Sequence, residues 1–106
     1  LTMARFDVYA HPERAARETT PYLVDVQNNY IDRLDSRVVI PMRPESLYRL
    51  KLRDLNPVFD IEGHPMVLDT AALAAFPARE LVQRVTNLES HRGEIQAAMD
   101  CLFGAY

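Results

Sequence analysis

Two short apolar runs, residues 22–27 and 37–42, form the clearest pattern along the chain. Both are rich in Val, Ile and Leu and are bounded by polar turn residues, which predicts two β-strands. Residues 28–36 between them contain Asn28-Asn29 and Asp35-Ser36, which predicts a hairpin with a twisted or bulged tip. Within the second run, Val38-Val39-Ile40 does not alternate with polar residues. We therefore expect a strand buried on both faces, in a barrel or beneath a dimer partner.

Three further segments predict short strands. Residues 5–9 alternate between apolar and polar side chains, and residues 56–61 and 66–70 flank a turn at 62–65, which predicts a second hairpin. The polar loop at 11–21 has a proline near each end and is long for a hairpin connection. Long loops in compact domains are often functional, and a solvated loop without a role is the alternative.

The last part of the chain predicts an α-helix over residues 91–103. Ser90 is the expected N-cap, and the charge of Glu94 in the first turn suits the helix dipole. Gly104 follows the last turn, where glycine commonly ends a helix. One apolar stripe at i, i+3, i+4 and i+7 predicts the buried face, formed by Ile95, Ala98, Met99 and Leu102.

Three segments have a mixed pattern. Residues 44–53 favour a short turn of helix followed by the end of a strand. Residues 71–76 favour a helix, because alanine and leucine form helices readily, and Pro77 would stop it. Residues 79–87 have apolar side chains at helical spacing, although the two valines in this segment also suit a strand.

The order of the predicted elements is strand, hairpin, hairpin and C-terminal helix. This order is typical of a mainly β fold, a small antiparallel barrel or sheet that carries one helix. We expect a single domain over residues 3–106, because the chain of 106 residues has no interdomain linker and Leu1-Thr2 precede the first methionine. Its 48% hydrophobic and 25% charged residues are ordinary for a domain with a packed core.

Charge and composition narrow the possible functions. The net charge of −3 argues against nucleic-acid binding through bulk charge and leaves a protein partner open. The single Cys101 excludes an internal disulfide and a multi-cysteine zinc site, and we expect a small buried side chain on the helix. The sequence has no signal peptide and no apolar run of about 18 residues, so we expect a soluble cytoplasmic protein without membrane contact.

No catalytic motif stands out in the sequence. His11, His64 and His91 are scattered, and none has a second His or Cys at metal-ligand spacing. The three glycines form no phosphate-binding motif. We therefore expect no catalytic residue, no cofactor and no metal. A phosphodiester-cleaving set of His91, Arg92 and Glu94 is an alternative, although nothing else in the sequence indicates an RNA path.

Four aspartates flank the two predicted hairpins. Asp25 and Asp32 lie beside the first hairpin, and Asp60 and Asp69 lie beside the second. Acid–base roles are conceivable for such carboxylates. We expect instead that they are solvent-side residues of half-buried strands.

Several short motifs occur together along the chain. They are Phe6-x-Val8-Tyr9, Leu23-Val24-Asp25-Val26-Gln27, Ile31-Asp32, Val38-Val39-Ile40-Pro41, Pro57-Val58, Asp69-x3-Leu73 with Pro77 beyond, and Leu88-x-Ser90-His91-Arg92-x-Glu94-Ile95. The strand motifs together with Leu-x-Ser-His-Arg form a specific combination. These motifs resemble those of CcdB-type toxins, the toxin halves of bacterial toxin–antitoxin pairs. The resemblance runs in the same order through almost the whole chain from Met3.

The resemblance implies a small SH3-like antiparallel β-barrel of the CcdB/MazF type with a C-terminal helix, a tight homodimer and no enzyme activity. Family toxins bind the GyrA subunit of DNA gyrase, a type II topoisomerase, and trap its complex with cleaved DNA. A CcdA-like antitoxin binds the toxin through a disordered segment. Toxin and antitoxin together repress their operon, so the toxin meets DNA only through that complex.

The C-terminal tail departs from the family pattern. In the family the tail is Trp-Gly-Ile and carries gyrase poisoning, whereas here the equivalent positions are Gly104, Ala105 and Tyr106 and the chain has no tryptophan. Losing such an anchor at an interface often costs ~2 kcal/mol or more. Phe103 matches the family's aromatic residue before the tail, and Tyr106 is also a good interface residue, two positions late. These four residues are the expected gyrase-binding set.

Two other hypotheses remain beside gyrase poisoning. In the first, the chain keeps the CcdB fold and binds antitoxin or another partner but no longer poisons gyrase, which the changed tail favours. In the second, the chain is a ribonuclease like the MazF toxins, which share the barrel. Fold alone does not fix function, and the sequence shows no basic groove.

For antitoxin contact, the resemblance points to the loop after the first strand and to the outer grooves of the dimer. Here this loop is residues 11–21, and Arg14 and Arg17 are the expected antitoxin-binding residues. Glu13 and Glu18 make the loop differ from a strictly basic one, so the antitoxin should differ as well. Exchanging the two arginines for Glu should weaken antitoxin binding.

Overall fold

The computed structural model describes residues 3–31 and 33–104. The strands are β1 (Asp7–Ala10), β2 (Tyr22–Asp25), β3 (Ser36–Pro44), β4 (Val58–Ile61), β5 (His64–Leu68), β6 (Ala74–Pro77) and β7 (Arg84–Asn87). The helices are α1 (Arg92–Phe103) and the short 3-10 helices η1 (Arg14–Glu18), η2 (Asn29–Ile31), η3 (Glu45–Leu47), η4 (Thr70–Ala72), η5 (Ala78–Glu80) and η6 (Glu89–His91).

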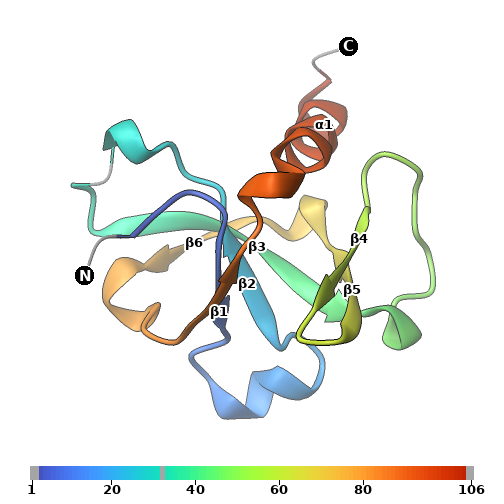
Figure 1. The fold of residues 1–106 in the computed structure, drawn as a ribbon, viewed down its shortest axis with the longest axis horizontal. Coiled ribbons are helices and arrows are strands. Elements are labelled where there is room, and N and C mark those ends of the chain that lie inside the picture. Colours follow the sequence, from blue (N-terminus) through green and yellow to red (C-terminus); the bar gives the residue numbers. More distant parts are fainter. Residues whose placement is uncertain (1–2, 32, 105–106) are drawn as a thin grey trace.

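The strands of the described residues form one antiparallel sheet in the order β4-β5-β3-β2-β1-β7, with β6 beside β3. β3 organises the sheet, because it pairs with β2 along one edge and with β6 and then β5 along the other. Figure 1 shows that the sheet curls into a half-barrel, with α1 at its top in this view. The predicted fold class, mainly antiparallel β with one C-terminal helix, is confirmed, as are the two predicted hairpins.

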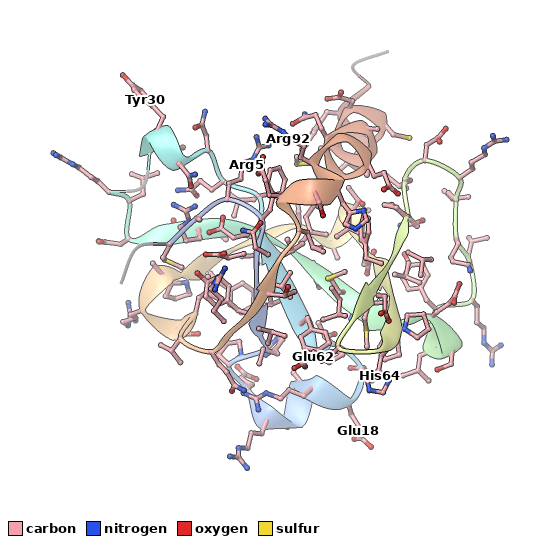
Figure 2. All side chains as sticks on the ribbon, viewed as in Figure 1. Arg5, Glu18, Tyr30, Glu62, His64 and Arg92 are labelled. Carbon is pink, nitrogen blue, oxygen red and sulfur yellow. The ribbon has the colours of Figure 1, made fainter. Side chains whose placement is uncertain are left out.

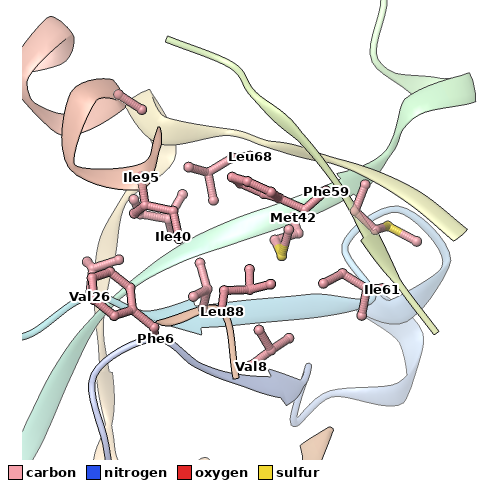
Figure 3. Close-up of a cluster of buried hydrophobic side chains, with 13 residues drawn as sticks. Phe6, Val8, Val26, Ile40, Met42, Phe59, Ile61, Leu68, Leu88 and Ile95 are labelled. Carbon is pink, nitrogen blue, oxygen red and sulfur yellow. The ribbon is translucent and has the colours of Figure 1, made fainter. Parts of the chain in front are cut away.

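The main core lies inside the curled sheet and beneath α1 (Figure 3). Ile95 and Ala98 enter it from α1 and are fully buried, while Met99 packs at its margin, so these three residues confirm the predicted apolar face of the helix. Leu102, the fourth predicted member, is partly buried and lies outside this cluster. The buried cluster consists of Phe6, Val8, Val24, Val26, Ile40, Met42, Phe59, Ile61, Met66, Leu68, Leu88, Ile95 and Ala98.

β3 is buried on both of its faces, as its unalternating sequence predicts. Ile40 and Met42 point into the main core, and Val39 points to the other face of the sheet. There it joins a second, smaller cluster with Tyr9, Leu23 and Leu81. Residues of the same chain therefore cover both faces, and this burial does not require a dimer partner.

One predicted helix is wrong, and one segment whose pattern suited either a helix or a strand forms a short 3-10 helix and a strand. Residues 71–76 form η4 and then the start of β6, whose Ala75 pairs with Val38 of β3. Residues 79–87 form η5 and then β7, which pairs with β1. In both segments a strand partner satisfies the backbone N–H and C=O groups, and this pairing outweighs the helix propensity of the side chains.

Two predicted local details are also wrong. η3 supplies the predicted turn of helix, but no strand end follows it before residue 53. Ser90 lies inside η6 and does not cap α1; His91 is the N-cap and makes no capping hydrogen bond through its side chain. Gly104 does end the helix as predicted, in the left-handed conformation at φ 73° that glycine adopts without strain.

Candidate functional site

The predicted gyrase-binding tail begins at an exposed aromatic side chain. Phe103 is the last residue of α1 and is 69% exposed, although large apolar side chains are normally buried. The N–H of Gly104 donates to the carbonyl oxygen of Asp100, which fixes the direction in which the chain leaves the helix. The other two predicted residues, Ala105 and Tyr106, lie outside the described residues.

A second exposed apolar cluster lies at η2, inside the segment predicted to be a hairpin tip. Tyr30 is 91% exposed, and Ile31 and Leu34 are about half exposed. Together with Arg33 they line an open hollow of about 240 Å³. Grouped exposed apolar residues mark contact surfaces more reliably than single ones. Three large apolar residues inside an otherwise polar turn are the signal in the sequence.

Arg5 ties η2 to α1. Its backbone N–H donates to Oδ1 of Asn29 at 2.8 Å, and its Nη2 donates to Oε1 of Gln96 on α1 at 3.1 Å. In the view of Figure 2, Arg5 lies between Tyr30 of η2 and α1. Phe103 lies seven residues after Gln96, which places both on the same side of the helix, about 10 Å apart along its axis. We call this surface the η2–α1 face; its apolar members are Tyr30, Ile31, Leu34 and Phe103.

The predicted antitoxin loop lies at the other end of the molecule, at the bottom of Figure 1. Arg14 and Arg17 both lie on η1 but differ in role. Arg14 is exposed, whereas Nε of Arg17 donates to the carbonyl oxygen of His11 at 2.7 Å and holds the loop in shape. His11 is buried against Phe76, and this burial lowers the pKa of its imidazole.

The prediction that Asp25 lies on the solvent side is wrong. Its carboxylate is fully buried and pairs with the equally buried Arg37 at 2.8 Å. Burial raises the pKa of Asp25, and the hydrogen bond from Arg37 opposes this rise. Asp69 is partly buried and pairs with Arg43, and Asp60 is exposed as expected. The fourth predicted carboxylate, Asp32, lies outside the described residues.

A comparison with known protein families decides the class of this molecule. The family model described as CcdB protein matches residues 5–104. The chain belongs to the CcdB family. The resemblance seen in its motifs is thereby confirmed, and the chain is a CcdB-type toxin of toxin–antitoxin systems. The matched residues include η1, η2 and the described part of the tail.

The geometry of this CcdB-family toxin gives little support to chemistry at its histidines. Nδ1 of His91 lies 3.1 Å from Oε1 of Glu94, but Arg92 turns to Glu89, so the three side chains do not converge on one point. No group of His, Cys, Asp and Glu in residues 3–31 and 33–104 has the arrangement of a metal site. Cys101 lies on α1 and is partly, not fully, buried.

Within the part of the chain that the structure describes, no helix has the length and apolar character needed to cross a bilayer.

Proposed function

We propose that this toxin binds the GyrA subunit of DNA gyrase through the η2–α1 face and traps the gyrase–DNA cleavage complex without a catalytic step of its own. One observation carries the proposal: a CcdB-family chain exposes large apolar side chains on two elements that Arg5 holds together. Aromatic residues such as Tyr30 and Phe103 are frequent anchors at protein interfaces.

The proposed contact also includes the tail residues Gly104, Ala105 and Tyr106. The tail has no tryptophan, so its own apolar contact area is smaller than that of the Trp-Gly-Ile tail of the family. Tyr30 and Ile31 add exposed apolar surface on the same face, and in this proposal they compensate for the missing indole.

We propose a CcdA-like antitoxin as the second partner, bound through Arg14 and Arg17 of η1 by a toxin homodimer. Any contact with DNA then goes through the toxin–antitoxin complex. The alternative is a CcdB-family protein that binds only antitoxin or another partner and no longer poisons gyrase, and the changed tail is the observation that favours it.

A supercoiled-plasmid cleavage assay with the gyrase of the host tests the proposal. We expect linear plasmid to accumulate with the toxin and to be reduced about tenfold or more by Phe103→Ala or Tyr30→Ala, because each removes an interface anchor. Val82→Ala is the control, because Val82 is also highly exposed, at 75%, but lies away from the η2–α1 face. Its neighbour Gln83 accepts a hydrogen bond from the backbone N–H of Ala10, at the end of β1 that leads into η1.

One result would contradict gyrase poisoning itself, and another would contradict the proposed contact face. The first is a folded toxin that binds its antitoxin but yields no linear plasmid, which would support the alternative function. The second is cleavage that Phe103→Ala and Tyr30→Ala leave unchanged, which would place the contact elsewhere on the molecule.

A further inference from the structure

One buried amide side chain, that of Gln27, forms a hydrogen bond to the backbone of η2. Gln27 is 6% exposed, and its two amide atoms make different bonds. Nε2 donates to the carbonyl oxygen of Ile31 at 3.0 Å, and Oε1 accepts from the backbone N–H of Val38 at 3.0 Å. The side chain thus joins the end of η2 to the neighbouring strand β3.

Gln27 is itself fixed by the buried ion pair. Its backbone N–H donates to Oδ1 of Asp25 at 3.0 Å, and Nη2 of Arg37 approaches its carbonyl oxygen at 3.4 Å. Nε of Arg37 donates to the second carboxylate oxygen of Asp25 at 2.8 Å. In the described residues Nη1 of Arg37 is buried without a hydrogen-bond partner.

This arrangement is a poor way to gain stability. Burying two charges costs solvation, and apolar residues of similar size often stabilise a fold equally well or better. An orphaned Nη1 adds to that cost. Hydrogen bonds between polar groups do, however, fix the conformation of the backbone. This matters for the loop around η2, because Tyr30, Ile31 and Leu34 are exposed and their packing contributes little to its conformation.

We propose that Gln27, anchored by the Asp25–Arg37 pair, is a positioning residue that fixes η2 in the conformation that presents Tyr30 and Ile31 to a protein partner. Preorganised side chains avoid the entropy that a loose loop loses on binding. The identity of the partner as gyrase rests on the proposed function, whereas the rigidity of the loop does not.

The absence of tryptophan from the chain supplies a direct test. In a Tyr30→Trp background the introduced indole is the only one, and its fluorescence anisotropy reports the mobility of η2. Gln27→Met keeps the length of the side chain and removes both hydrogen bonds. Gln83→Met is the matched control on an exposed glutamine. We expect lower anisotropy for Gln27→Met, but not for Gln83→Met, in the Tyr30→Trp background. With the native Tyr30 in place, we expect about tenfold weaker binding to the GyrA subunit of gyrase for Gln27→Met and unchanged binding for Gln83→Met.

Gln27→Glu separates positioning from general stability. The carboxylate still accepts from Val38 but no longer donates to Ile31, so we expect hydrogen exchange at the Val38 amide to stay slow while the indole becomes mobile. This comparison remains informative if Gln27→Met lowers the unfolding temperature. Binding of the antitoxin at η1 should be unchanged in both variants.

Each outcome has a separate meaning. Unchanged anisotropy in both Gln27 variants would overturn the positioning role. A mobile loop with unchanged gyrase affinity would overturn the link between loop rigidity and binding. No gyrase binding by the parent protein would contradict the proposed function, while the anisotropy result would still decide whether Gln27 positions the loop.

Discussion

Two buried aspartates on neighbouring strands have opposite electrostatic environments. For Asp25, burial has the largest effect and raises the pKa of the carboxyl group. Burial also acts on Asp7, but hydrogen bonds from Arg84, Asn87 and the backbone N–H of Ala4 outweigh it and lower the pKa of Asp7. Tyr9 donates to Asp7 at 3.3 Å, and burial together with both carboxylates raises the pKa of its hydroxyl to about 12. The ionised form of Asp7 therefore stabilises the fold.

We expect Asp7→Asn to lower the free energy of unfolding by about 1–3 kcal/mol at neutral pH, because donors near it lose a charged acceptor. The pKa of Asp7 is lowered from 3.8, so its contribution is complete above that pH and is lost as the pH falls through the folded-state value. In urea titrations the difference between wild type and variant should therefore shrink below pH 3.8. A constant difference down to about pH 2 would contradict this assignment.

At the scale of elements, the predicted helix and strands are correct where the residues of one segment are enough to determine its secondary structure. The stripe around Ile95 and the glycine at 104 define α1 locally, and the apolar content of 22–27 and 37–42 defines β2 and β3. The prediction for residues 71–76 was wrong because their alanines favour a helix locally. Their strand pairing depends on the edge of β3, which no local sequence pattern reveals.

The candidate sites follow the same rule. Family resemblance indicated the tail and η1. The η2–α1 face depends on Arg5, which contacts Asn29 on η2 and Gln96 on α1, and Gln96 lies 91 residues away from Arg5, a proximity that sequence spacing does not show. The prediction that Asp25 is exposed was wrong because its partner lies on another strand. A lone aspartate in a strand is normally exposed, and its partner Arg37 becomes visible only once β2 and β3 pair.

The structure of η1 sharpens the prediction for antitoxin binding. Arg14→Glu should weaken antitoxin binding roughly tenfold, because it replaces an attractive exposed charge with a repulsive one. It should leave the unfolding temperature unchanged, whereas Arg17→Glu also removes the bond to His11 and should alter the loop itself. Arg33→Glu makes the same charge change beside η2 and is the control in titration calorimetry. Equal affinity of Arg14→Glu and wild type would contradict a role for η1.

At the scale of the whole molecule, the proposed homodimer needs an interface outside the core, because the core is formed by the residues of a single chain. The protomer's radius of gyration, 12.9 Å, matches the value of about 13 Å for a compact domain of 100 residues, and its core lies within one chain. Ala71, Ala74 and Ala75 are nonetheless exposed on η4 and β6. Among the described residues β6 pairs only with β3, so its other edge presents unpaired backbone groups, and its small exposed side chains leave room for close approach of a second protomer.

We therefore expect Ala74→Arg to convert a dimer into a folded monomer, because a bulky charge on this edge prevents close contact while the core remains intact within each chain. Sedimentation velocity measures the change, and unfolding temperature should lose its dependence on protein concentration. Ala15→Arg, an exposed alanine on η1, is the control and should remain dimeric. A dimeric Ala74→Arg would move the interface away from β6, while an unfolded variant would show that the protomer depends on its partner more than its buried core indicates.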